Sequence, residues 1–195
     1  MAVPRQLPNA ITIARILCAP VFLWLLLADG GADGGLRWAA AILFIVAIAT
    51  DGVDGYIARK YDIVSDLGKL LDPIADKALT GLAFIGLSVL GELPWVITIV
   101  VLVREIGITV YRLMVVSDHV LAAAWMGKLK TVAQAVALSL ALLPLDALVD
   151  ADAWRSGVWW AGVVTMTIAV VLTIASGVDY IVSEVRGARR KRRAS

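Results

Sequence analysis

Six long apolar stretches constrain this chain more than any other feature. Each has about 20 residues, which is the length that an α-helix needs to cross the hydrocarbon core of a bilayer. The stretches are residues 11–28, 36–58, 68–90, 94–116, 129–148 and 157–182. The composition agrees, since 61% of the residues are hydrophobic and only 17% are charged. We therefore predict an all-α integral membrane protein with six transmembrane helices, in which residues 1–185 form one membrane domain and 186–195 a basic tail.

The basic residues of the chain gather at alternate ends of these stretches. The connections around 28–35, 91–94 and 145–157 carry mostly acidic residues, whereas the opposite ends and the tail carry most of the Lys and Arg. Short loops rich in Lys and Arg stay in the cytoplasm. This pattern predicts a multi-pass protein of the cell membrane with both termini in the cytoplasm. The tail has no aromatic residue among its basic ones, so we expect it to anchor on membrane lipids and predict no nucleic-acid partner.

Four aspartates lie at the expected cytoplasmic side of the second and third stretches. Asp51 and Asp54 end the second stretch, and Asp72 and Asp76 follow in the third. An isolated carboxylate in the hydrocarbon costs about 3 kcal/mol or more, so this placement needs compensation. At about 100° per residue, Asp51 and Asp54 share one side of a helix, and Gly68, Asp72 and Asp76 form a single stripe on the next. A helical hairpin would therefore bring the four carboxylates together.

The chemistry of such a group favours divalent cations. Four close carboxylates cannot all stay ionised without positive charge nearby. Ligands that are all oxygen favour Mg²⁺ or Mn²⁺, and four of them suit two ions that clamp a diphosphate. Gly55, Ala58 and Gly68 would leave space between the helices, and Arg59 offers donors to phosphate. Taken singly, these features have other readings, because small residues also serve close helix packing and buried acids also line ion pathways.

The whole pattern resembles the signature of the CDP-alcohol phosphatidyltransferase family. It reads Asp51-x2-Asp54-Gly55-x2-Ala58-Arg59-x8-Gly68-x3-Asp72-x3-Asp76, with every signature position filled. The segments "LPNAITIARILCAPVF", "LLDPIADKAL", "VREIGITVYR" and "WMGKLKTVAQ" extend the resemblance over nearly the whole chain. The resemblance implies a six-helix fold, a homodimer and an active site that opens to the cytoplasmic leaflet.

The resemblance also implies a reaction and its residues. The donor would be CDP-diacylglycerol and the acceptor sn-glycerol 3-phosphate, giving phosphatidylglycerol phosphate and CMP. Asp51, Asp54 and Asp72 would hold two Mg²⁺ or Mn²⁺ ions, with Asp76 as a shared ligand and as the general base. The donor site would comprise Asn9, Thr12, Gly55, Ala58, Arg59, Ser65 and Gly68. Asn9 has an alternative role as a helix cap and Ser65 as a turn residue.

An acceptor that carries a phosphate needs a second cationic pocket. Arg104 and Arg112 lie eight residues apart on nearly the same helix face, and Lys128 and Lys130 open the next stretch. We predict that these four residues bind the acceptor. Arg104 is the strongest candidate because it lies deep in its helix beside Glu105, although a Lys near a helix end can also be only a membrane anchor.

Two other functions remain open. A sister enzyme would transfer the same group to inositol phosphate, serine or phosphatidylglycerol. An ion-coupled transporter would also use buried acids, but it needs a polar path through the membrane, and these acids gather at one side.

Overall fold

The computed structural model describes the backbone of residues 7–60, 66–114 and 123–194, and the side chains of 10–50, 71, 74–111, 125–183, 185 and 186. These residues form six α-helices and one short 3₁₀ helix, and none of them lies in a β-strand. The elements are α1 (Leu7–Asp29), α2 (Gly35–Lys60), α3 (Asp66–Val89), α4 (Trp95–Met114), α5 (Ala123–Leu142), η1 (Leu145–Leu148) and α6 (Asp152–Ala194). The prediction of six helices is confirmed.

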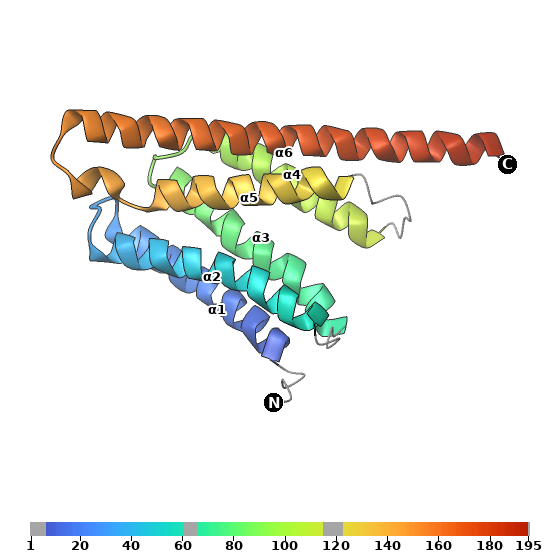
Figure 1. Ribbon diagram of the computed structural model, residues 1–195, viewed down its shortest axis with the longest axis horizontal. Coiled ribbons are helices and arrows are strands. Elements are labelled where there is room, and N and C mark those ends of the chain that lie inside the picture. Colours follow the sequence, from blue (N-terminus) through green and yellow to red (C-terminus); the bar gives the residue numbers. More distant parts are fainter. Residues whose placement is uncertain (1–6, 61–65, 115–122, 195) are drawn as a thin grey trace.

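Successive helices run in opposite directions through one bundle (Figure 1). The turns that follow α1, α3 and α5 lie together at the left of the figure, and we call this the Arg37 end; α2, α4 and α6 finish toward the other side. Helices α1, α2 and α3 pack on one another, α5 packs on α6 and α2, and α4 contacts α3 and α6. Helix α4 therefore lies between α3 and α6, and α5 also contacts α3.

The centre of the bundle is an apolar core. Phe22 of α1, Phe44 of α2 and Phe84 of α3 are almost fully buried, and the rings of Phe22 and Phe44 lie 5.5 Å apart. Gly86 allows α1 and α3 to approach closely, because a Cβ at this position would lie 2.6 Å from a methyl group of Leu26. Small residues serve this purpose in membrane helices, where backbones come close to gain van der Waals contact.

Buried hydroxyl and amide groups join helices across this core. The hydroxyls of Ser88 on α3 and Thr98 on α4 lie 2.6 Å apart, and the Gln134 amide on α5 donates to Thr173 on α6 at 2.9 Å. Each pair satisfies polar atoms that have no access to water, as interhelical hydrogen bonds do in membrane proteins.

The outer faces of the helices are apolar. Val96, Val103 and Trp125 are each about 70% exposed, which is unusual for a surface in water but normal for one in lipid (71%, 68% and 73%). Among the described residues, Ala10–Asp29 and Asp152–Ser183 are long and apolar enough to cross a membrane on these criteria alone. That all six helices span the bilayer stays a prediction.

Several helix boundaries differ from the sequence prediction; α1 and α5, for example, begin at Leu7 and Ala123 rather than at residues 11 and 129. The fifth stretch was expected to run to residue 148, but α5 ends at Leu142 and η1 follows. Pro144 explains the difference, because proline has no N–H and disfavours helical geometry at the residue before it. Helix α6 begins at Asp152, before the predicted 157, and its backbone continues without a break into the basic tail as far as Ala194.

Arg37 holds three turns together at the Arg37 end. Its side chain is buried, and its two Nη atoms donate to the Glu92 carboxylate at 2.7 and 2.5 Å. Its Nε and Nη2 donate to the carbonyls of Leu142 and Ala141 at 2.8 and 2.9 Å. The last carbonyls of a helix have no partner within the helix, so Arg37 caps α5 and fixes the α3–α4 turn to α2 at the same time.

We expect Arg37→Met to lower the free energy of unfolding by about 3 kcal/mol, because it leaves the Glu92 carboxylate and the α5 carbonyls without a donor. Denaturant titration of the purified protein in detergent measures this. Arg155→Met is the matched control, since Arg155 pairs with Asp150 and Asp152 at the exposed surface and its loss should cost no more than about 1 kcal/mol. Equal losses in the two variants would contradict the role of Arg37.

Candidate functional site

The four aspartates of the sequence pattern lie on two consecutive helices that contact each other. Asp51 and Asp54 belong to the second half of α2, and Asp72 and Asp76 to the first half of α3. Only the side chain of Asp76 is among those described. Within the described residues, no group of three or more potential ligands gathers. The metal site with Asp51, Asp54 and Asp72 therefore stays a prediction.

Most of the predicted donor site lies outside the described side chains. This holds for Asn9, Gly55, Ala58, Arg59, Ser65 and Gly68, and for Arg112 of the predicted acceptor site. Thr12 is described and is 1% exposed on α1, with the buried Arg15 one turn further along. A buried arginine in an apolar helix was not singled out from the sequence, although its charge is a signal of function.

Asp76 begins a network of charged groups between helices. Its Oδ2 lies 3.0 Å from the Nζ of Lys77, and the same Nζ lies 2.6 Å from Oε2 of Glu105 on α4. The side chains of Asp76 and Lys77 are each 26% exposed, so this part of the network is open to a ligand.

Glu105 is the centre of this network. Its Oε1 accepts a hydrogen bond from Nη1 of Arg104 at 2.9 Å and another from Nζ of Lys130 on α5. Nη2 of Arg104 donates to Ser176 on α6 at 2.8 Å. We call these residues the Glu105 cluster: Asp76, Lys77, Arg104, Glu105, Lys130 and Ser176. Three cations face two carboxylates, which leaves a formal charge of +1 among groups from four helices.

The guanidinium of Arg104 needs the glycine that faces it on α6. A Cβ at Gly177 would lie 3.2 Å from Cγ of Arg104, so the missing side chain makes room for the arginine. Nε of Arg104 is buried and has no hydrogen-bond partner among the described residues. A buried donor without an acceptor costs free energy, and a bound anion would supply the missing acceptor.

The structure thus brings together two of the predicted acceptor residues, Arg104 and Lys130, while Lys128 lies exposed on α5. The sequence argument missed Lys77 and, as a partner of several cations, Glu105. Both stand directly beside residues that it did select. The signal was present, because a charge in an apolar helix needs a partner on a neighbouring helix.

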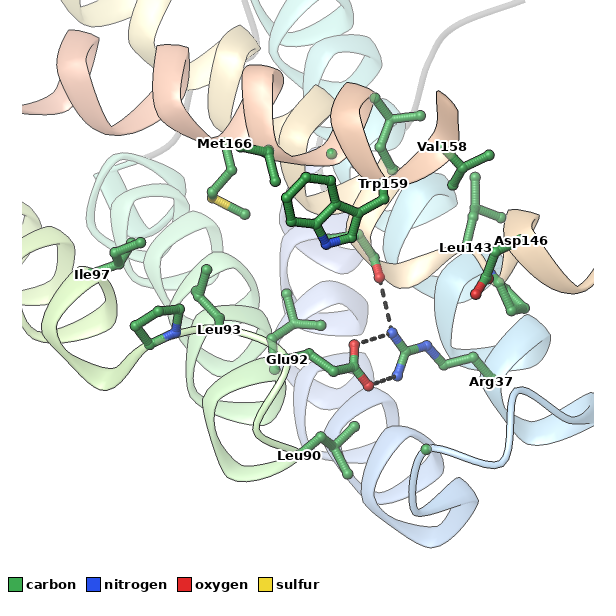
Figure 2. A pocket seen from close by; sticks show the side chains of 18 of the residues that line it. Arg37, Leu90, Glu92, Leu93, Ile97, Leu143, Asp146, Val158, Trp159 and Met166 are labelled. Carbon is green, nitrogen blue, oxygen red and sulfur yellow. Dashed lines mark hydrogen bonds and ion pairs between the residues drawn. The ribbon is translucent and has the colours of Figure 1, made fainter. Parts of the chain in front are cut away.

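A separate cavity of about 1060 Å³ lies at the Arg37 end. Its walls are mostly apolar and include Trp159 and Met166 of α6 and Ile97 of α4, with the Arg37–Glu92 pair exposed to it (Figure 2). None of the described residues that line this cavity belongs to the Glu105 cluster, so the two are distinct.

Asp33 lies at this cavity, in the turn between α1 and α2 and outside the apolar stretches. Burial raises the pKa of its carboxyl above the usual 3.8; Arg37 opposes this shift, and the negative charges of Asp146, Glu92 and Asp29 add to it. Its backbone has a φ of +54°, a region in which Asp and Asn are the best tolerated side chains.

The sequence matches a known family over most of its length. Residues 5–175 match the model of the CDP-alcohol phosphatidyltransferase family. The chain belongs to this family and is therefore a phosphatidyltransferase. The enzymes of the family are membrane-integral and generally depend on divalent metals.

Named relatives show which members of the family this chain is similar to. A Mycobacterium tuberculosis protein named probable phosphatidylglycerophosphate synthase is 44% identical over 93% of this chain and 82% of its own length. Two proteins are named CDP-diacylglycerol–glycerol-3-phosphate 3-phosphatidyltransferase. The one from Bacillus subtilis is 40% identical over 90% of this chain and 93% of its own, and that from Escherichia coli is 31% identical over the same shares.

We expect Asp33→Asn to stabilise the protein at pH 7.5 and to lose this effect toward pH 4. Because the folded-state pKa of Asp33 is raised, the folded state prefers the protonated carboxyl, and the ionised form costs stability once the pH exceeds that pKa. The asparagine keeps the left-handed backbone and removes the charge. Thermal unfolding midpoints of wild type and variant at both pH values test this.

Asp150→Asn is the control for this experiment, since it removes the same charge from a side chain that is 94% exposed. It should give no gain at either pH. A gain for Asp33→Asn that is equal at pH 4 and pH 7.5, or equal in both variants, would show that burial of Asp33 is not the cause.

Proposed function

We propose that this protein transfers the phosphatidyl group of CDP-diacylglycerol to sn-glycerol 3-phosphate, giving phosphatidylglycerol phosphate and CMP. The observation that carries the proposal is the Glu105 cluster, which places a surplus of positive charge beside Asp76. An acceptor with its own phosphate needs such a second cationic site, apart from the one that binds the diphosphate. The names of the relatives agree with this acceptor.

The residues of the cluster have separate roles in this proposal. Asp76 accepts the proton of the acceptor hydroxyl, whose oxygen forms a bond to the phosphatidyl phosphorus while the bond from that phosphorus to CMP breaks in the net reaction. Arg104, with a free donor at Nε, and Lys77 bind the acceptor phosphate. Lys130 and Lys128, also expected at this site, contribute positive charge from α5.

The aspartates fit the divalent cations on which the family depends. The predicted set on α2 and α3 contains only carboxylate oxygens, the donors that Mg²⁺ and Mn²⁺ prefer. We propose that Asp51, Asp54, Asp72 and Asp76 hold two such ions. When bound, they would supply positive charge to the diphosphate of the donor and make CMP a better leaving group.

All six helices are proposed to span the membrane. Helices α1 to α5 have 20 to 26 residues, or roughly 30 to 39 Å, which matches a hydrocarbon core of about 30 Å. The distribution of Lys and Arg favours a cytoplasmic active site and cytoplasmic termini. The homodimer and the division between the membrane domain and the tail at residue 185 also stay predictions.

Incubation of the purified protein with CDP-diacylglycerol, Mg²⁺ and a panel of radiolabelled acceptors tests the function. We expect lipid product and CMP from glycerol 3-phosphate, and none from inositol phosphate, serine or phosphatidylglycerol. Asp76→Asn should reduce the rate at least 100-fold because it removes the base and a metal ligand. A chelator should abolish the reaction. Product from another acceptor alone would overturn the assignment of glycerol 3-phosphate.

Arg104→Ala should raise the apparent KM for glycerol 3-phosphate by about 10-fold or more, since a hydrogen bond to a charged group contributes about 1.5–3 kcal/mol. The KM for CDP-diacylglycerol should change by less than about twofold, in keeping with a role on the acceptor side alone. Steady-state kinetics with each substrate varied in turn measures both. Arg155→Ala, at the Arg37 end, is the control. Equal changes for both substrates would indicate that Arg104 is structural.

A further inference from the structure

Glu105 has more charged partners than any other carboxylate in the described part of the chain. It bonds to Lys77 of α3, to Arg104 of its own helix and to Lys130 of α5. Its side chain is 7% exposed. A carboxylate that is buried in this way has little surface with which to meet a substrate, so its effect must pass through the cations that it binds.

These cations differ in how far they are exposed. The Lys130 side chain is 3% exposed, whereas those of Arg104 and Lys77 are 16% and 26% exposed. The cluster therefore has a closed side, formed by Glu105 and Lys130, and an open side, formed by Arg104, Lys77 and Asp76. Among the described residues, Glu105 alone pairs both with Lys130 of the closed side and with Arg104 and Lys77 of the open side.

We infer that Glu105 is a positioning residue for the acceptor phosphate: it holds the Lys77 ammonium and the Arg104 guanidinium beside Asp76, so that one phosphate contacts both cations while the acceptor hydroxyl meets the base. The inference rests on the proposed function and deepens it. Without Glu105, Lys77 keeps its contact with Asp76 and Arg104 its hydrogen bond to Ser176, but no described group joins the two cations, and their like charges repel. Their position relative to each other is lost even though the positive charge of the pocket increases.

Two simpler explanations of Glu105 predict different results when it is replaced. If Glu105 acted only through its charge, its removal would strengthen the binding of an anion. If it served only to neutralise buried Lys130, any carboxylate would suffice, and removal of both charges together would restore the protein. A positioning role requires both the charge and the reach of the glutamate.

Glu105→Asp separates these accounts, because it keeps the charge and shortens the side chain by one methylene. We expect the apparent KM for glycerol 3-phosphate to rise about 10-fold, while the KM for CDP-diacylglycerol stays within about twofold. A second comparison sets Glu105→Gln/Lys130→Met against Lys130→Met alone. We expect the KM for glycerol 3-phosphate to be about 10-fold higher in the double variant than in Lys130→Met. These two variants differ only at residue 105, and neither contains a buried Lys130 that has lost its partner.

Binding is measured beside turnover, as the shift in thermal unfolding midpoint that each substrate causes. The shift caused by glycerol 3-phosphate should become smaller in the Glu105 variants, and the shift caused by CDP-diacylglycerol should stay the same. Where a variant turns over too slowly for a KM, these thermal shifts test the inference in its place. The inference would be overturned if, in both comparisons, the KM and the thermal shift for glycerol 3-phosphate stayed within twofold of the reference, which is wild type for Glu105→Asp and Lys130→Met for the double variant. A lower KM would overturn it as well.

Turnover of glycerol 3-phosphate by the wild-type protein distinguishes a failure of the proposed function from a failure of this inference. If it makes no product from glycerol 3-phosphate, the proposed function fails. The same variants are then compared with the acceptor that the protein does use, and an unchanged KM for that acceptor overturns the role of Glu105 as well.

Discussion

A charged side chain within a bundle of membrane helices has no water to solvate it, and this constraint shapes both halves of the molecule. At one end, Arg37 is satisfied by Glu92 and by the last carbonyls of α5. In the other half, Glu105 is satisfied by cations from three helices. Each pairing joins elements that are distant in the sequence, so the need to satisfy charge also determines which helices lie side by side.

The apolar core between these two polar centres separates their functions. Phe22, Phe44 and Phe84 fill the bundle where the helices approach most closely, and small residues such as Gly86 allow that approach. A transporter would need a continuous polar path along this route, whereas the described pairs Ser88–Thr98 and Gln134–Thr173 are buried and bonded to each other. The arrangement instead favours an enzyme that acts at one side of the membrane, where Asp76 and the Glu105 cluster are partly exposed, while Arg37 stabilises the other side.

Several features were predictable from local pattern alone. The six apolar stretches predicted six helices, and the spacing of four aspartates with Gly55, Ala58, Arg59 and Gly68 predicted the family to which the chain belongs. Arg104 was selected because an unpaired guanidinium in an apolar helix is costly, and it does have partners in Glu105 and Ser176. The predicted end of α5 was wrong, because the prediction followed the apolar residues as far as residue 148. Pro144, which has no N–H for a helical hydrogen bond, is the stronger local signal.

The sequence by itself determined the helices, the membrane setting and the type of chemistry, because periodicity, hydropathy and the cost of intramembrane charge are properties of short segments. Only the tertiary structure decided the partners. Arg37, at the start of the second apolar stretch, is a buried link between three turns, and Glu105, the neighbour of a selected residue, is the centre of a cluster. Ion pairs between residues 25 or 55 positions apart depend on how helices pack, and no local pattern contains that information.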